Sequence, residues 1–311
     1  MRVLFIGTGE IGVPVLRSLL NSKEHEVVGV VTQPDKPVGR TQMIEAPPIK
    51  KAAADLAIPI LQPDQIKRPE TVTAVRELAP EVMVVMAYGQ ILPRSVLEIP
   101  TIACLNLHAS LLPRHRGAAP IQSAILAGDR ETGITVMYMA EGLDTGDILL
   151  QSRVEIAAEE TGGSLHDKLA QLAPAALDEA LSQLQSGSAR RVPQDSAVAT
   201  YAPKLEREDG RVNWSEPAAL IERKIRAFNP WPGAFAMLRD GTGRERKLKV
   251  FSAKAVSSGN ASPGAIVRSD NTLVIAASDG AVSLGEVQLE GKRRMNAAEF
   301  LRGYSATLRV E

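Results

Sequence analysis

The chain of 311 residues has few of the features that mark secreted, metal-binding or membrane proteins. It holds one cysteine, Cys104, so an internal disulfide framework is excluded and a reducing compartment is expected. Its four histidines form no close cluster with that cysteine, so we predict no metal site. No run of about 18 uncharged apolar residues is present, and the N-terminus resembles a strand rather than a leader. We therefore expect a cytoplasmic protein and a monomer.

The chain as a whole also has no excess of either charge. Its formal net charge is zero, so the overall balance does not indicate a nucleic-acid partner. The distribution is less even, because residues 1–204 hold 19 Lys and Arg against 23 Asp and Glu, whereas residues 205–311 hold 17 against 13. The C-terminal third is therefore the part that could meet a polyanion.

Short apolar runs alternate with helical patterns in the first half of the chain. Runs with few polar interruptions, separated by helices, are typical of a mostly parallel sheet that is covered on both faces. We therefore predict an α/β, Rossmann-like domain over residues 1–189. Strands are expected at Val3–Ile6, Val27–Thr32, Val82–Ala87, Ala103–His108 and Ile134–Met139, and helices at Val13–Leu20, Glu70–Leu78, Ala118–Leu126 and Ser164–Leu184.

The pattern changes after this domain. Residues 185–207 are polar, contain Gly and Pro and show no apolar period, so we place a linker at 190–207. Beyond it, β-branched runs separated by turn residues predict a small, OB-like β-barrel over residues 208–311. Its expected elements are a helix at Ala218–Ala227 and strands at Lys247–Ala253, Gly264–Val267, Leu273–Ala277 and Val282–Leu289.

The glycine-rich turn Gly7–Gly12 fits the pattern GxGxxG between a strand and a helix. This is the setting of a dinucleotide site, in which amide groups at a helix N-terminus bind a pyrophosphate. However, the second strand does not end in the acid that would hold a ribose, and Asp35 lies beyond a proline. Glu10 would also place a negative charge beside the phosphates. We favour a tight turn without a nucleotide, and predict no NAD.

Three polar residues are candidates for catalysis. Asn106 and His108 alternate with apolar residues at the end of one predicted strand, so they point to the same side. Asp144 lies in a glycine-rich turn after a later strand, and ligands of open α/β sheets bind at the carboxyl ends of strands. An amide can stabilise an oxyanion, and an imidazole beside a carboxylate can relay protons. A hydrogen-bonded core pair and an ordinary turn remain the alternative interpretation.

Several segments then resemble the folate-dependent formyltransferase family. Residues 106–114 (NLHASLLPR) resemble its signature, and residues 142–147 (GLDTGD) resemble its second motif. Residues 32–37, 117–121, 201–204 and 225–232 resemble the branch of the family that formylates initiator methionyl-tRNA. Together these segments span most of the chain.

The resemblance implies that Asn106, His108 and Asp144 are catalytic and that 10-formyltetrahydrofolate is the formyl donor. It further implies a folate site and a surface for the acceptor end of tRNA. The folate residues would be Tyr88, Gln90, Ile91, Leu92, Ser110, Leu111, Leu112, Pro113 and Glu141. The tRNA residues would be Arg40, Lys204, Arg226, Lys249, Lys292 and Arg293.

The sequence departs from the family pattern at three places, and other functions stay open. Thr41 and Gln42 follow Arg40 where lysines are frequent, His115 stands where a tryptophan is usual, and the first turn mimics a dinucleotide site. The nearest alternative is a formyltransferase for a nucleotide-linked amino sugar. An NAD-dependent dehydrogenase is supported only by Gly7–Gly12. A non-catalytic RNA-binding protein would leave Asn106, His108 and Asp144 without a function.

Overall fold

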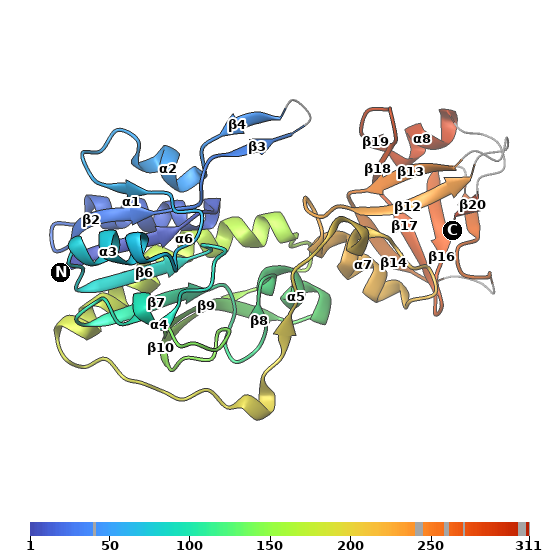
Figure 1. Ribbon diagram of the computed structural model, residues 1–311. Coiled ribbons are helices and arrows are strands. Elements are labelled where there is room, and N and C mark those ends of the chain that lie inside the picture. The colour runs from blue at the N-terminus through green and yellow to red at the C-terminus, as the bar shows by residue number, and fades with distance from the viewer. Residues whose placement is uncertain (40–41, 240–244, 258–260, 270, 304–308, 311) are drawn as a thin grey trace. The chain divides into compact units, whose positions relative to one another are not determined.

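The computed structural model in Figure 1 describes most of the chain, namely residues 1–39, 42–239, 245–257, 261–269, 271–303 and 309–310. It forms two compact units. Unit 1 comprises Met1–Pro120, Glu131–Glu155 and His166–Ala202, and unit 2 comprises Ile121–Arg130, Ile156–Leu165 and Pro203–Glu311. In the part of the chain that the structure describes, no helix is both long and apolar enough to span a membrane.

A sheet of seven strands in the order β10-β9-β7-β6-β1-β2-β5 forms the centre of unit 1. From β5 to β7 the neighbours are parallel, whereas β9 runs antiparallel to both β7 and β10. The strands are β1 (Arg2–Gly7), β2 (Glu26–Val31), β5 (Ile60–Leu61), β6 (Val82–Met86), β7 (Ala103–His108), β9 (Glu131–Tyr138) and β10 (Ile148–Glu155).

The central parallel strands β1 and β6 consist almost entirely of buried residues. All five residues of β6 are buried, as are five of the six residues of β1, and such strands need cover on both faces. Helices supply that cover (Figure 1), with α1 packed on α2 and α3 on α4. The helices of unit 1 are α1 (Val13–Asn21), α2 (Pro48–Ala53), α3 (Pro69–Glu77), α4 (Arg94–Leu97) and most of α6 (Gly162–Gln185), whereas α5 (Pro120–Ala127) belongs almost entirely to unit 2.

Two short strand pairs complete unit 1. A hairpin joins β3 (Lys36–Val38) to β4 (Met43–Glu45), and β8 (Arg116–Gly117) pairs in parallel with β11 (Tyr201–Ala202). One strand of the second pair, β11, lies within the segment that the sequence predicts to be a linker. Residues 190–202 of this segment belong to unit 1, so most of the segment is attached to the first unit, and it contains a short 3-10 helix, η2 (Ser196–Val198).

Unit 2 contains two antiparallel sheets of small strands, in the orders β19-β18-β13-β12-β20 and β14-β17-β16-β15. Both contribute to one core with α7 (Ala218–Ala227), in which Ile221, Leu248 and Phe300 are fully buried. The remaining elements are η3 (Arg207–Gly210), β12 (Ala234–Arg239), β13 (Glu245–Val250), β14 (Ala253–Val256), β15 (Ile266–Ser269), β16 (Thr272–Ala276), β17 (Ala281–Leu284), β18 (Glu286–Leu289), β19 (Met295–Asn296), α8 (Ala297–Gly303) and β20 (Arg309–Val310).

The predicted fold class is confirmed: a mostly parallel sheet with helices is followed by small antiparallel strands. Details differ where burial does not follow the apolar pattern. The predicted strand Val282–Leu289 is two strands, β17 and β18, separated at Gly285, where a Cβ would lie 2.5 Å from Ser252 Oγ. Two further strands were not predicted: β10, which lies at the edge of its sheet and has one buried residue, Leu149, and β12.

Candidate active site

The candidate site begins at the carboxyl end of β7, in the middle of the unit 1 sheet. Asn106 pairs with Val85 of β6 on one side and with Met137 of β9 on the other. His108, two residues further, lies on the same face. His108 is 6% exposed, whereas Asn106 is half-buried. The strand therefore places an amide and an imidazole on one face near its carboxyl end, and a carboxylate from the turn between β9 and β10 lies beside the imidazole.

That turn carries Asp144, between β9 and β10. Asp144 has a φ of 51°, in the left-handed region, which Asp tolerates better than most residues. The turn is tight, because a Cβ at Gly146 would lie 1.7 Å from the carbonyl oxygen of Tyr138. Oδ2 of Asp144 lies 3.6 Å from Nδ1 of His108 and accepts a hydrogen bond of 2.8 Å from the main-chain N–H of Gly117. The predicted meeting of His108 and Asp144 is thus present.

The other ring nitrogen of His108 faces a main-chain group. Nε2 of His108 lies 2.9 Å from the carbonyl oxygen of His115. A carbonyl oxygen only accepts hydrogen bonds, so Nε2 carries a hydrogen and donates. In the neutral ring Nδ1 is then the nitrogen with the free lone pair. The proton that His108 can gain or lose is therefore on the side of Asp144.

Together these groups can assist acyl transfer to an amine. The carboxamide of Asn106 offers N–H donors to a developing oxyanion. The imidazole can accept or donate a proton at Nδ1, which lies 3.6 Å from Oδ2 of Asp144. The three groups come from two segments that meet only in the folded chain.

No residue at this site has the setting of a covalent nucleophile. Ser110 is fully buried, and its hydroxyl donates to the carbonyl oxygen of Arg114 at 2.7 Å. Burial raises the pKa of the Cys104 thiol to about 12. A thiol with that pKa is almost entirely protonated near neutral pH and reacts poorly. Direct attack by the acceptor amine fits the site better than a covalent enzyme intermediate.

The residues predicted to bind folate follow the ends of β6 and β7 or lie in the turn after β9, and they differ in exposure. Ile91 is 83% exposed and Glu141 is exposed, while Gln90, Leu111 and Pro113 are half-buried. The side chains of Tyr88, Leu92 and Leu112 are each 3% exposed. Tyr88 and Leu92 belong to a core cluster of unit 1, and burial raises the pKa of the Tyr88 phenol to about 12. These three side chains therefore offer a ligand little exposed surface.

The glycines of the first turn have a packing function. A Cβ at Gly7 would lie 2.7 Å from Cε1 of Phe5 and 2.8 Å from the carbonyl oxygen of Met86. Thr8, between the glycines, donates its hydroxyl to the carbonyl oxygen of Tyr88 at 3.0 Å. Asp35 is bonded to Lys50 at 2.8 Å and to Gln62 at 2.7 Å, and these bonds lower the pKa of its carboxyl group. Close packing of β1 on β6 accounts for glycine at position 7.

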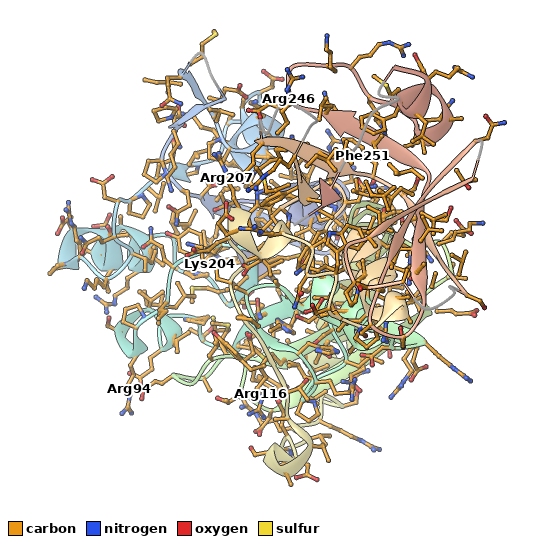
Figure 2. All side chains as sticks on the ribbon, turned by 90° about the vertical axis from the view of Figure 1, so that its right-hand side faces the viewer. Arg94, Arg116, Lys204, Arg207, Arg246 and Phe251 are labelled. Atoms are coloured by element: carbon orange, nitrogen blue, oxygen red, sulfur yellow. The ribbon has the colours of Figure 1, made fainter. Side chains whose placement is uncertain are left out.

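The basic residues predicted to contact tRNA fall into different groups. Lys204, which Figure 2 labels, Lys249 and Lys292 are exposed. Arg226 forms an ion pair with Glu222 and donates to the carbonyl oxygen of Glu160 at 2.8 Å. Arg293 forms an ion pair with Glu299. Arg40 lies outside the residues that the structure describes.

Sequence reasoning missed two residues that contact this site, Gln194 and Thr200. Gln194 donates to the carbonyl oxygen of Asp144 at 2.8 Å, and the Thr200 hydroxyl accepts from the main-chain N–H of His115 at 2.8 Å. Both lie in the polar stretch interpreted as a linker, and no local pattern distinguishes them. Among the described residues, no three His, Cys, Asp or Glu side chains are grouped as a metal ion would need.

Comparison with known proteins identifies the family. Residues 1–181 match the family described as formyl transferase, and residues 204–305 match the formyl transferase C-terminal domain. Among solved structures, a sugar 3N-formyl transferase, WlaRD, has a TM-score of 0.66 at 17% identity, covering 94% of this chain and 99% of that one. HypX from Aquifex aeolicus in complex with tetrahydrofolic acid has a TM-score of 0.62 at 20% identity, covering 98% and 47%. Fold and site together define a formyl transferase.

Relatives with higher identity show to which branch of the formyl transferases this chain belongs. A methionyl-tRNA formyltransferase of Akkermansia muciniphila is 45% identical over 98% of this chain and 97% of its own length. One from Geobacter sulfurreducens is 44% identical over 98% of this chain and 94% of its own. The chain belongs to the methionyl-tRNA formyltransferase family.

Proposed function

We propose that this protein transfers the formyl group of 10-formyltetrahydrofolate to the free amino group of methionyl-initiator tRNA. The product, formylmethionyl-tRNA, serves translation initiation. The observation that carries the proposal is the identity of 45% over 98% of the chain with a methionyl-tRNA formyltransferase, since it extends through both units. The contact of 3.6 Å between His108 and Asp144 supports the chemistry.

The proposed reaction needs one bond to form, one to break and one proton to move. The methionine amine attacks the formyl carbon, and the bond from that carbon to the folate nitrogen breaks. Asn106 donates to the formyl oxygen as negative charge develops on it. His108, protonated at Nδ1 and stabilised by Asp144, adds a second donor. Asp144 assists the transfer of the proton from the amine to the folate nitrogen, so charge and atoms balance.

The exposed lysines of unit 2 are proposed to contact the tRNA backbone. Lys204, Lys249 and Lys292 are exposed, and lysines bind phosphates as point charges. Arg40 is proposed to act on the acceptor stem, so Arg40→Ala should weaken use of tRNA while folate affinity stays the same. Arg226 and Arg293 are paired with glutamates and are weaker candidates. The exposed side chains of Ile91 and Glu141 are proposed to contact the folate.

A formyl-transfer assay with charged initiator and elongator methionine tRNAs tests the function directly. We expect formylation of the initiator, dependence on 10-formyltetrahydrofolate and little product with the elongator. No product from initiator methionyl-tRNA would contradict the proposal. The same preparation, run through size-exclusion chromatography, tests the expected monomer.

The amino-sugar alternative has less support. Structures of sugar formyltransferases share the fold, but the one with dTDP and 5-N-formyl-THF is only 17% identical to this chain. An assay with a nucleotide-linked amino sugar in place of tRNA discriminates between the two, and formylation of the sugar alone would favour the alternative.

A further inference from the structure

Residues 192–202, here called the strap, follow α6 after a short connection and run along unit 1 (Figure 1, yellow). Three main-chain attachments hold the strap. Val192 pairs with Ile148 at the start of β10 through two hydrogen bonds of 2.8 and 2.9 Å. The main-chain N–H of Thr200 donates to the carbonyl oxygen of Pro113 at 3.3 Å, and its carbonyl accepts from Arg116 at 2.9 Å. Pairing of β11 with β8 then ends the strap.

One side chain of the strap, Gln194, is hydrogen-bonded to the turn that carries Asp144. Its amide NH₂ donates to the carbonyl oxygens of Asp144 at 2.8 Å and Gly146 at 2.7 Å. Its Oε1 accepts from Nε and Nη2 of Arg116 at 3.0 and 2.8 Å. Figure 2 labels Arg116 on the strand beside the strap. The amide group of Gln194 therefore uses both of its N–H donors and both lone pairs of its oxygen. A carboxylate at this position could not replace it, because a carboxylate cannot donate to two carbonyl oxygens.

A second strap side chain, Thr200, holds the residue that orients His108. The Thr200 hydroxyl accepts from the main-chain N–H of His115 at 2.8 Å and lies 3.4 Å from its Nδ1. The carbonyl oxygen of His115 in turn binds Nε2 of His108 at 2.9 Å. His115 has a φ of 59° and Asp144 a φ of 51°. Such backbone conformations persist in residues other than glycine where surrounding contacts hold them.

We propose that Gln194 and Thr200 are positioning residues, which set the distance and orientation of Asp144 and His108 for formyl transfer. Neither touches the reacting atoms. Gln194 acts through the turn of Asp144, and Thr200 acts through the carbonyl of His115. The catalytic part of this proposal rests on the proposed function. The effect on rate arises because a displacement of about 1 Å at a catalytic group can cost about 100-fold in turnover.

The test for Gln194 uses Gln194→Met, which keeps length and removes the amide, and Gln194→Glu, which keeps the acceptor for Arg116 but cannot hold the turn. We expect kcat to fall about 10- to 100-fold in both, with the folate KM changed less than about twofold. Gln185→Met, the same change at the exposed end of α6, should leave kcat unchanged. In an Asp144→Asn background Gln194→Met should add little further loss, because both act through one group.

The test for Thr200 relies on rescue. Thr200→Val keeps the shape and removes the hydroxyl, whereas Thr200→Ser keeps the hydroxyl. We expect Thr200→Val to lose about 10-fold in kcat and to shift the pH profile of turnover, and Thr200→Ser to restore both. Equal losses in Val and Ser variants would indicate a packing function only and would overturn the proposal for Thr200.

Amide hydrogen exchange separates failure of this proposal from failure of the proposed function. Gln194→Met should speed exchange of the amides at residues 144–147 while the melting temperature stays within a few degrees of wild type. If the wild-type protein formylates methionyl-tRNA and Gln194→Met keeps its kcat, the positioning proposal is wrong and the function stands. If the wild type forms no product, the proposed function is wrong. Independently of activity, unchanged amide exchange at residues 144–147 in Gln194→Met would show that Gln194 does not hold the turn.

Discussion

Nδ1 of His108 lies 3.6 Å from Oδ2 of Asp144, although one residue ends β7 and the other follows β9. The two strands are antiparallel neighbours, with His108 opposite Thr135 and Leu105 opposite Tyr138. The turn after β9 therefore starts beside the first half of β7 and brings Asp144 back to His108. Because Nε2 of His108 is bound to the carbonyl of His115 at 2.9 Å, Nδ1 is the nitrogen that can exchange a proton. Proton exchange at His108 therefore takes place at Nδ1, the nitrogen that faces Asp144.

Asn106→Ala and Asp144→Asn are each expected to cut turnover by at least about 100-fold, the scale for losing an oxyanion donor or a positioned acid–base group. Single-turnover formylation of methionyl-tRNA measures the effect. Asp147→Asn, the same change in the same turn, should cost much less. Wild-type turnover in either of the first two variants would remove that residue from the mechanism.

Gly7→Ala is expected to destabilise the protein by about 1–3 kcal/mol, because the added methyl meets Phe5 and the carbonyl of Met86 closer than contact distance. Urea unfolding measures the loss. Gly39→Ala tests strain alone, since the added methyl would meet open space at a φ of +69°.

Titration of the wild type with NADH tests whether the turn Gly7–Gly12 binds a dinucleotide, and we expect no binding. Tight NADH binding would revive the dinucleotide interpretation of the turn.

The single thiol should be inert in the folded protein. Because burial raises the pKa of Cys104 to about 12, we expect no labelling by a disulfide reagent at pH 8 and one reactive thiol after unfolding in urea. The folded state holds the proton more tightly than the unfolded state. Ionisation of Cys104 should therefore reduce stability as pH rises above about 9. Comparison of urea midpoints at pH 8 and 10 for wild type and Cys104→Ala isolates this contribution, and equal pH dependence would contradict it.

Removal of the positive charge should affect tRNA binding at Lys249 but protein stability at Arg226. Lys249→Met should weaken tRNA binding and reduce its salt dependence, with little change in stability, because the side chain is exposed. Arg226→Met should destabilise unit 2 by about 1–3 kcal/mol, because it removes hydrogen bonds to Glu222 and to the carbonyl of Glu160. Filter binding at several salt concentrations and urea unfolding make the comparison. A large loss of tRNA affinity with normal stability in the arginine variant would show that it contacts tRNA.

Much of the architecture follows from local sequence patterns. The apolar run at Val82–Met86 and the largely apolar run at Ala103–His108 are short and alternate with helical patterns, so a covered, mostly parallel sheet was predictable. The alternation of Asn106 and His108 within such a run also places both side chains at the strand end. The motif with Asp144 and its glycines indicates a tight turn. These features depend on neighbours within a few residues, which the sequence itself specifies.

Other features depend on contacts between distant parts of the chain, and only the tertiary structure decided them. The proton direction of His108 depends on the carbonyl of His115, and the orientation of Asp144 depends on Gln194, which lies in a stretch with no pattern beyond polarity. Arg226 and Lys249 look alike in the sequence, yet one is paired with Glu222 and the other is exposed. Hydrogen bonds and ion pairs are directional and short-ranged, so composition and periodicity cannot specify which groups form them.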